Sequence, residues 1–385
     1  MRDPANLQPP AADRTGATEP AAYAPEHVRR IAPYVPGKPI EELAREHGLA
    51  EAAIVKLASN ENPRGPSPKA REAIMAACAG VTRYPDGNGF ALKRAIAARY
   101  GVGREQIVLG NGSNDVLELA TQAFLRPGDE AVYAQYAFAV YPLATQARGA
   151  TGVEVPARDY GHDLPAMARA INSRTRIVFL ANPNNPTGTW IEPAEVKAFV
   201  ASVPRSCIVV LDEAYDEYLA PAQRSASAGW IAGHPNLVVS RTFSKAYGLA
   251  GLRVGFGLMD ASVADLLDRV RQPFNVSSVA QAAAVAALAD TRYVVESAEL
   301  NRAGLAQLRA ALDAMGVAYV PSHANFLLVE VGDGARVYER MLRDGVIVRP
   351  VANYGLPRHL RVTVGLPEEN RRFLAALESA LARER

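Results

Sequence analysis

The feature that most constrains the fold is an alternation of short apolar runs with amphipathic stretches between Val108 and Leu258. Apolar runs rich in β-branched residues are typical of buried strands, and an amphipathic stretch between two of them predicts a connecting helix. We therefore predict a large, wound, mostly parallel α/β sheet with helices on both faces. The predicted strands are Gln106–Leu109, Ala131–Tyr133, Arg176–Leu180, Ile208–Leu211, Leu237–Ser240 and Val254–Leu258, and the predicted helices include Asp115–Phe124, Leu164–Ile171 and Pro193–Val203.

The chain after Ser278 predicts a second, smaller α/β unit. Its helical pattern runs through Ala289 and Tyr293–Met315, and the apolar spacing then changes toward the alternation typical of strands. Residues 31–58 contain three prolines and are too short to form a core, so we expect them to pack with this unit. The predicted C-terminal elements are the strands Asn325–Val331, Val346–Arg349 and Leu360–Val364 and the helix Ala335–Asp344.

The expected organisation of the chain therefore has four parts. Residues 1–25 are rich in Ala and Pro and are expected to be a disordered extension. Residues 26–62 are expected to pack with the small domain, and residues 63–278 to form the large domain that carries the site. Residues 279–385 are expected to form the small C-terminal domain.

Composition narrows the range of partners. The formal net charge is +2 and 21% of residues are charged, so the sequence has no electrostatic footprint for nucleic acid or an anionic membrane. The two cysteines and six histidines show no spacing typical of a metal site, and we predict none. The N-terminal residues lack the apolar core of a signal peptide, and we expect a cytoplasmic protein with small-molecule partners.

A lysine follows the predicted strand Leu237–Ser240. Lys245 has hydroxyl side chains close to it in sequence, and Arg253 comes eight residues later. This combination suits an amine nucleophile beside a bound phosphate group. The alternative is an exposed loop lysine, which is the commoner case for a lysine taken alone.

An acidic residue follows the apolar run Val209–Leu211. Burying Asp212 there is costly unless it meets a positive partner, and a protonated pyridine nitrogen would supply one. Tyr215, three residues later, could reach a phenolic oxygen of the same ring. The alternative is that Asp212 caps the following helix.

Two further polar turns follow predicted strands. In Asn182–Gly188 two prolines restrict the backbone and hold Asn185 in one orientation, although such pairs also occur in ordinary turns. In Leu109–Asp115 a glycine-bearing turn opens a helix, and its free N–H groups suit a phosphate. This turn lacks the third glycine of a dinucleotide fingerprint and the Gly-Lys of a P-loop, so a small phosphate monoester fits better.

All four polar segments follow the carboxyl ends of predicted strands, where wound sheets gather their ligand sites. A single cofactor that needs an amine, an acid, a hydrogen bond to a ring oxygen and a phosphate cradle explains the four together. Four independent coincidences are much less probable.

In combination these motifs resemble the fold type I aminotransferases, which use pyridoxal 5'-phosphate (PLP), and most closely the histidinol-phosphate aminotransferases. The resemblance runs from about Tyr34 to the C-terminus. It includes Ser59–Pro63, Arg83–Gly87 and Leu360–Gly365. It implies the fold, the cofactor, and an exchange of an amino group between an amino donor and a 2-oxo acid.

By this resemblance Lys245 binds PLP as a Schiff base and moves the substrate proton, while Asp212 keeps the pyridine nitrogen protonated. Tyr215 and Asn185 then hydrogen-bond the ring oxygen. Phe138 stacks on the ring, at a position where the family often has a tyrosine. The resemblance assigns the cofactor phosphate to Ser113, Asn114, Thr242, Ser244 and Arg253.

The same resemblance implies how the substrate anion is bound. Arg361 is expected to bind it, because a guanidinium group matches a carboxylate or phosphate in a bidentate way. Arg349 and Tyr34 are expected as further contacts, together with Asn185.

The resemblance also implies a homodimer with shared active sites. Tyr84 resembles a residue that reaches the cofactor phosphate and substrate of the neighbouring subunit. Phe274 and Asn275 are expected to line the pocket from across the subunit interface. The alternative for Tyr84 is an ordinary Tyr-Pro turn.

The expected reaction converts histidinol phosphate and 2-oxoglutarate into imidazole-acetol phosphate and glutamate, as in histidine biosynthesis. An aromatic aminotransferase for phenylalanine or tyrosine stays open, because those substrates also present a flat ring and an anion. A PLP-dependent phospho-amino-acid decarboxylase shares the scaffold and the Lys–Asp pair. A regulator with a DNA-binding module is disfavoured, since the first 30 residues are too short and too proline-rich to form one.

Overall fold

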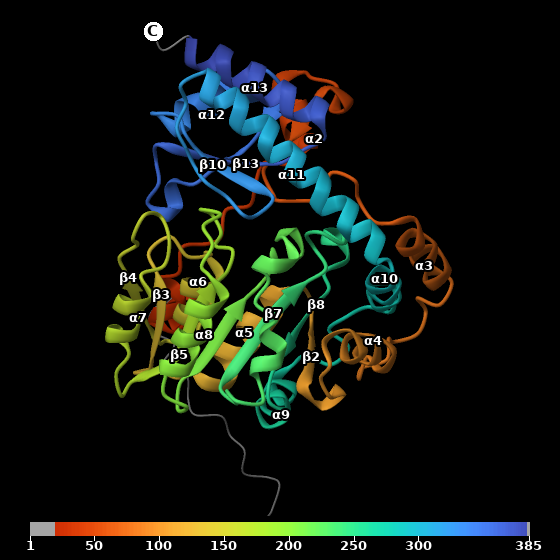
Figure 1. Ribbon diagram of the computed structural model, residues 1–385, viewed down its shortest axis with the longest axis vertical. Helices are drawn as coiled ribbons and strands as arrows, with labels where there is room; N and C mark the ends of the chain where they lie inside the picture. Colours follow the sequence, from red (N-terminus) through yellow and green to blue (C-terminus); the bar gives the residue numbers. More distant parts are fainter. Residues whose placement is uncertain (1–19, 383–385) are drawn as a thin grey trace, which may run out of the picture.

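The chain is described by a computed structural model over residues 20–382, so the predicted extension at residues 1–25 lies largely outside the described residues. The largest element is a seven-stranded sheet in the order β2-β8-β7-β6-β5-β3-β4, covered by helices on both faces (Figure 1). β8 runs antiparallel to both of its neighbours and the other pairs are parallel, which confirms the predicted fold class. The strands are β2 (Ile107–Gly110), β3 (Glu130–Ala134), β4 (Thr151–Val155), β5 (Thr175–Ala181), β6 (Ile208–Asp212), β7 (Leu237–Thr242) and β8 (Gly255–Leu258).

Both faces of this sheet are buried, which explains why its strands are continuous apolar runs. Along β6, Val209 and Leu211 lie in one hydrophobic core, and Ile208 and Val210 lie in the core on the opposite face. The helices that build these two layers are α3 (Pro68–Cys78), α4 (Phe90–Tyr100), α5 (Ser113–Phe124), α6 (Val140–Ala147), α7 (Leu164–Ala170), α8 (Pro193–Ser202), α9 (Ala261–Val270) and α10 (Ser278–Ala289).

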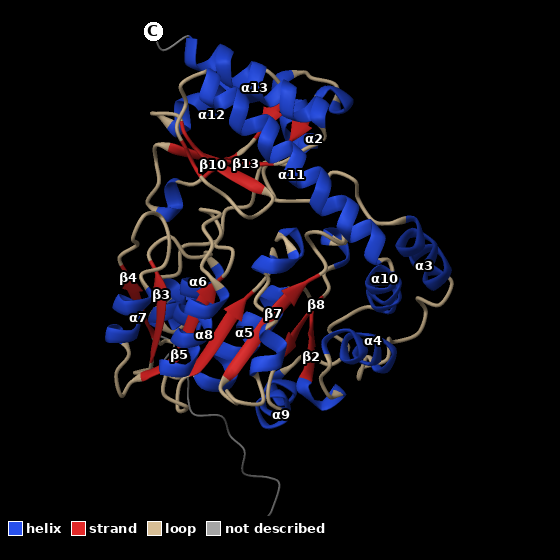
Figure 2. Cartoon of the chain, viewed as in Figure 1, coloured by secondary structure: helices blue, strands red, loops and turns tan. Residues whose placement is uncertain are grey.

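The C-terminal part forms a separate four-stranded antiparallel sheet with helices packed on it, as Figure 2 shows. The predicted strand Val346–Arg349 was wrong as a single element. Val346–Ile347 (β11) pairs with Val55–Lys56 (β1), whereas Arg349–Pro350 (β12) joins the four-stranded sheet. The other elements here are β9 (Tyr319–Val320), β10 (Phe326–Glu330), β13 (His359–Thr363), α11 (Thr291–Ala314), α12 (Gly334–Arg343) and α13 (Pro367–Ala382).

The N-terminal described segment contacts this C-terminal unit. It contains the short helices α1 (Glu26–Arg29) and α2 (Ile40–His47). Leu43 of α2 packs in a small core with Leu342 and Ile347, and β1 runs parallel to β11. The domain boundaries given above stay a prediction.

The helix α11 physically joins the two parts of the molecule (Figure 1). Its first half contributes Val294 and Ala298 to a core of the large sheet. Its second half contributes Leu308 and Leu312 to the core under the small sheet. One continuous 24-residue helix therefore spans from one hydrophobic core to the other.

The strand directions decide where polar side chains gather. β5, β6 and β7 are parallel, and β2 has the same direction because β8 runs antiparallel to both β2 and β7. Their carboxyl ends therefore meet at one edge of the sheet, the side that faces the small domain in Figure 1. The four predicted polar segments follow these four strands.

A buried ion cluster lies next to that edge. Arg241, in β7, donates from Nη1 to Glu213 Oε2 at 2.8 Å and from Nη2 to Asp216 Oδ2 at 2.9 Å and Glu217 Oε1 at 2.6 Å. All four side chains are at least nine-tenths buried. The arginine thereby supplies one positive charge shared by three carboxylates in the turn that follows β6, which stabilises the turn.

Replacing Arg241 with methionine should destabilise the chain by about 3–5 kcal/mol, because three buried carboxylates would lose their counter-charge. The measurement is urea unfolding followed by circular dichroism. As a control, Arg269→Ala removes an exposed pair with Asp265 and should cost no more than about 1 kcal/mol. Equal effects of the two substitutions would contradict this account of the cluster.

Candidate active site

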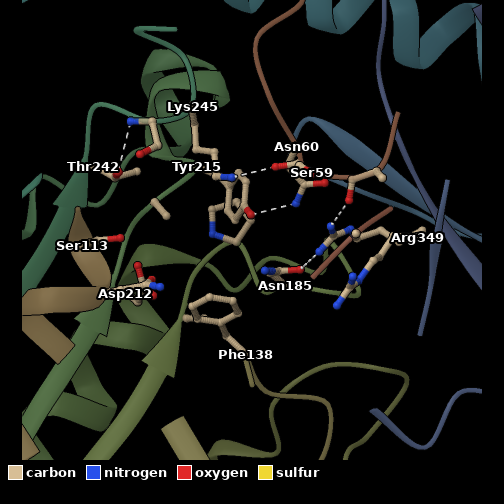
Figure 3. Close-up of a pocket in the computed structure, with 18 of the residues that line it drawn as sticks. Ser59, Asn60, Ser113, Phe138, Asn185, Asp212, Tyr215, Thr242, Lys245 and Arg349 are labelled. Carbon is tan, nitrogen blue, oxygen red and sulfur yellow. Dashed lines mark hydrogen bonds between the residues drawn. The ribbon is translucent and has the colours of Figure 1, made fainter. Parts of the chain in front are cut away.

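A pocket of about 190 Å³ lies at the carboxyl edge of the large sheet, between it and the small domain. Figure 3 shows Thr242, Ser113 and Asp212 on one side of Lys245 and Asn185 and Arg349 on the other. The pocket brings together nearly every residue that the sequence predicted for the site. The predicted residues that line it are Tyr34, Ser113, Asn114, Phe138, Asn185, Asp212, Tyr215, Thr242, Ser244, Lys245, Arg253, Arg349 and Arg361.

Lys245 projects into this pocket from the loop after β7. Its Nζ donates to the carbonyl oxygen of Ser59 at 3.1 Å, the contact marked in Figure 3. Burial, followed by the charge of Arg361, lowers the pKa of Lys245 to about 8. The neutral amine, which is the nucleophilic form, is therefore available near neutral pH.

Asp212 is the last residue of β6 and its carboxyl group is buried. Its Oδ2 accepts a hydrogen bond from Tyr141 Oη at 2.9 Å. Its Oδ1 is also buried and has no hydrogen-bond partner among residues 20–382. Burial raises the pKa of Asp212 to about 6. A buried carboxylate with one free oxygen fits a ligand that presents a positively charged N–H group, such as a protonated pyridine ring.

Tyr215 follows Asp212 in the turn after β6 and is held by the N-terminal segment. Asn60 Nδ2 donates to Tyr215 Oη at 2.9 Å, and the Asn60 backbone N–H donates to Thr363 Oγ1 at 2.9 Å. Asn60, whose φ is 55°, therefore connects Tyr215, in the turn after β6, with Thr363, at the end of β13. Burial raises the pKa of Tyr215 to about 12, so its hydroxyl stays protonated.

A phosphate-sized cradle forms at the N-terminus of α5. Gly112 has a φ of 83°, and a Cβ atom there would collide with the guanidinium group of Arg253. No side chain caps α5, so its first N–H groups are open to a ligand. Arg253 Nη1 donates to Ser244 Oγ at 3.3 Å, and the Ser244 backbone N–H donates to Thr242 Oγ1 at 3.1 Å. This donor set fits the phosphate of PLP.

Two buried arginines lie at the other end of the pocket. Arg361 donates from Nη1 to Asn185 Oδ1 at 2.6 Å and from Nη2 to the Ala58 carbonyl at 2.7 Å. Arg349 donates from Nη2 to the Val35 carbonyl at 2.7 Å, and its guanidinium carbon lies 5.4 Å from the centre of the Tyr34 ring. Both guanidinium groups are buried, so this end strongly favours an anion.

Tyr84 is the predicted site residue that lies outside this pocket. Its side chain is 83% exposed and stacks on Phe274, with ring centroids 4.8 Å apart. Asn275 is also outside the pocket, and its Nδ2 donates to Asp115 Oδ2 at 2.7 Å. In the single chain, therefore, none of these three residues contributes to the pocket.

Sequence reasoning missed two functional candidates in the pocket wall. Asn60 belonged to a motif that carried the family resemblance, but nothing in its spacing indicated a contact with Tyr215. Tyr141 lies on α6, three residues after Phe138, and no local motif marks it. Its amphipathic helix position predicts only burial in the core.

The described residues contain no group of three or more His, Cys, Asp or Glu side chains that could hold a metal ion. Among residues 20–382, no helix combines the length and apolar character needed to cross a lipid bilayer.

Comparisons with known proteins agree with this geometry. The sequence matches the family described as Aminotransferase class I and II over residues 52–377. Histidinol-phosphate aminotransferase 2 of Ralstonia nicotianae is 62% identical over 364 residues, which cover 94% of this chain and 97% of that protein. Histidinol-phosphate aminotransferase 1 of Cupriavidus pinatubonensis is 60% identical, and the match covers 93% of this chain and 96% of that protein.

Among solved structures, a histidinol-phosphate aminotransferase from Sinorhizobium meliloti in complex with pyridoxal-5'-phosphate superimposes with a TM-score of 0.86. It is 30% identical, and the match covers 94% of this chain and 98% of that one. The chain thus belongs to the class I and II aminotransferase family and, within it, to the histidinol-phosphate aminotransferases.

Proposed function

We propose that this chain is a PLP-dependent transaminase that converts histidinol phosphate and 2-oxoglutarate into imidazole-acetol phosphate and glutamate. One observation carries the proposal. A single pocket holds a lysine of lowered pKa, a buried acid with one free oxygen, a phosphate cradle and, at the other end, two buried arginines. The near full-length relatives named above support the choice of substrate.

When bound, PLP supplies an aldehyde carbon that bonds to amines and a pyridine ring that withdraws electrons from the substrate α-carbon. Lys245 Nζ would hold the cofactor, and as a free amine the same Nζ would accept the proton from the substrate α-carbon. Its lowered pKa leaves the amine free of a proton in a large share of molecules near pH 8.

The residues around Lys245 hold the ring. Asp212 would offer its free Oδ1 to the ring nitrogen and keep a proton there. Tyr215 and Asn185 would hydrogen-bond the ring oxygen, and Phe138 would stack on the ring face. The phosphate is held by the open end of α5 and by Ser113, Asn114, Thr242, Ser244 and Arg253.

The two arginines hold the substrate anion. Histidinol phosphate carries a phosphate group where an ordinary amino acid carries its carboxylate, and 2-oxoglutarate brings a carboxylate to the same place. The planar guanidinium group of Arg361 can bind either anion in a bidentate way. Arg349 adds a second positive charge, and Tyr34 covers this end of the pocket.

Steady-state kinetics with purified enzyme test the choice of substrate. We expect kcat/KM for histidinol phosphate to exceed that for phenylalanine and tyrosine by more than about tenfold, or roughly 1.4 kcal/mol in the transition state. Each donor should be measured with 2-oxoglutarate as acceptor. A tenfold preference for either aromatic amino acid would contradict the assignment, and carbon dioxide release without a keto product would indicate a decarboxylase.

We also propose that the active unit is a homodimer whose two active sites are shared between the subunits. We keep the predicted domain division and the cytoplasmic location as parts of this proposal. The support is a group of exposed large apolar side chains on the large domain. These are Met75, Val81, Tyr84, Phe90 and Phe274. Tyr84 and Phe274 stack on each other, and contiguous exposed apolar surface of this kind marks protein contact sites in many proteins. Contact with a second copy would cover it and could bring Tyr84 to the neighbouring cofactor phosphate.

Co-expression of two impaired variants tests the shared site. In a heterodimer of Lys245→Ala and Tyr84→Ala, a shared geometry places both lesions in one site and leaves the other site intact. We therefore expect mixed dimers to regain activity well above either parent. The controls are each parent variant expressed alone, and the two purified homodimers mixed under conditions in which subunits do not exchange. No gain in verified heterodimers would contradict a role for Tyr84 in the partner's site.

A further inference from the structure

We propose that Tyr141 is a positioning residue for Asp212: its hydroxyl holds one carboxylate oxygen and leaves the other free for the ring nitrogen of the cofactor. This inference rests on the proposed function and extends it to a residue that hydrogen-bonds the oxygen of Asp212 that does not face the cofactor. It would make the electron-withdrawing power of the site depend on a phenol that no family motif marks.

The geometry around Tyr141 allows little freedom. The residue lies on α6 and is fully buried. Its ring stacks on Phe179 of β5 with centroids 4.6 Å apart and planes 3° from parallel, and it meets Phe138 edge-on at 5.9 Å. These contacts fix the position of the phenol oxygen, which lies 2.9 Å from Asp212 Oδ2 and donates its hydrogen to it.

The two oxygens of Asp212 are thereby distinguished. Oδ2 is bound by Tyr141, whereas Oδ1 is buried without a partner in the described part of the chain. A carboxyl group held at one oxygen cannot rotate freely, so the free oxygen keeps one direction. Phe138 contacts both the pocket and the Tyr141 ring, which couples the stacking residue to the acid.

The hydrogen bond also acts on the charge of Asp212. Burial raises the pKa of Asp212, and the hydrogen bond from Tyr141, the Ala214 backbone N–H and the charge of Lys245 oppose that rise. Burial and the nearby Asp212 raise the pKa of Tyr141 well above its ordinary value, so the phenol remains a donor. The other titratable groups whose charges act on this pair are Tyr215, Tyr354 and Lys245.

Loss of the hydroxyl should therefore raise the pKa of the Asp212 carboxyl. More of the carboxyl would then be protonated at neutral pH, and a neutral acid gives the ring nitrogen no counter-charge. A hydrogen bond to a charged group shifts that group's pKa by on the order of one to two units. Without the hydroxyl, the ring nitrogen should therefore lose its proton at a correspondingly lower pH.

The test is Tyr141→Phe in the full-length holoenzyme, loaded with PLP labelled with ¹⁵N in the ring. The ¹⁵N chemical shift is followed between pH 6 and 9. We expect the wild-type ring nitrogen to stay protonated throughout and the variant to lose the proton within this range. We also expect kcat for histidinol phosphate to fall about tenfold or more with KM changed less than about threefold, since the substrate anion site is untouched.

Tyr133→Phe is the matched control, because Tyr133 is a buried tyrosine on β3 that lies outside the pocket. It should leave the ¹⁵N titration and kcat unchanged. A second comparison places Tyr141→Phe in an Asp212→Asn background, where the tyrosine has no carboxylate to hold. There we expect almost no further loss of kcat, and additive losses would overturn the proposal.

The outcomes separate the two proposals. Suppose that the wild-type enzyme turns over histidinol phosphate with a protonated ring nitrogen and that Tyr141→Phe gives the same ¹⁵N titration as the wild type. This result overturns the positioning role alone. A wild-type enzyme that binds no PLP or lacks this turnover contradicts the proposed function, and the positioning role fails with it.

Discussion

A buried, half-satisfied carboxylate is the constraint on which the site depends. Asp212 ends a strand whose side chains are buried on both faces, and one of its oxygens has no partner within residues 20–382. Such a group is costly in a protein interior unless a ligand brings a positive charge to it. Under the proposed function, the bound cofactor would relieve this cost. The charged acid would hold a proton on the ring nitrogen, and the protonated ring would withdraw electrons from the substrate.

The surrounding fold explains how this acid meets its partners. Parallel strands β5, β6 and β7, with β2 in the same direction, deliver Asn185, Asp212, Lys245 and the α5 N-terminus to one edge. The small domain and the N-terminal segment then add the arginine end and Asn60. Arg241 pairs with the other acidic residues after β6, and none of its ion pairs involves Asp212.

Much of this arrangement could be predicted, because polar residues directly after apolar runs are informative in a wound sheet. Strand β4 was missed, since it contains Gly152 and Glu154 and is largely exposed. The run Val346–Arg349 looks like one strand, but its two halves pair with different partners. Tyr141 and Asn60 act through contacts between residues far apart in sequence, which local spacing cannot indicate. Tyr84 is exposed in the single chain, and its role in a neighbouring subunit's site stays a proposal.

The most direct test is to identify the residue that binds the cofactor. The holoenzyme is reduced with borohydride, digested, and mapped by mass spectrometry for a phosphopyridoxyl group. The account predicts one modified peptide, with the added mass on Lys245. A modification on a different lysine, or a protein that stays colourless and unmodified with excess PLP, would contradict it.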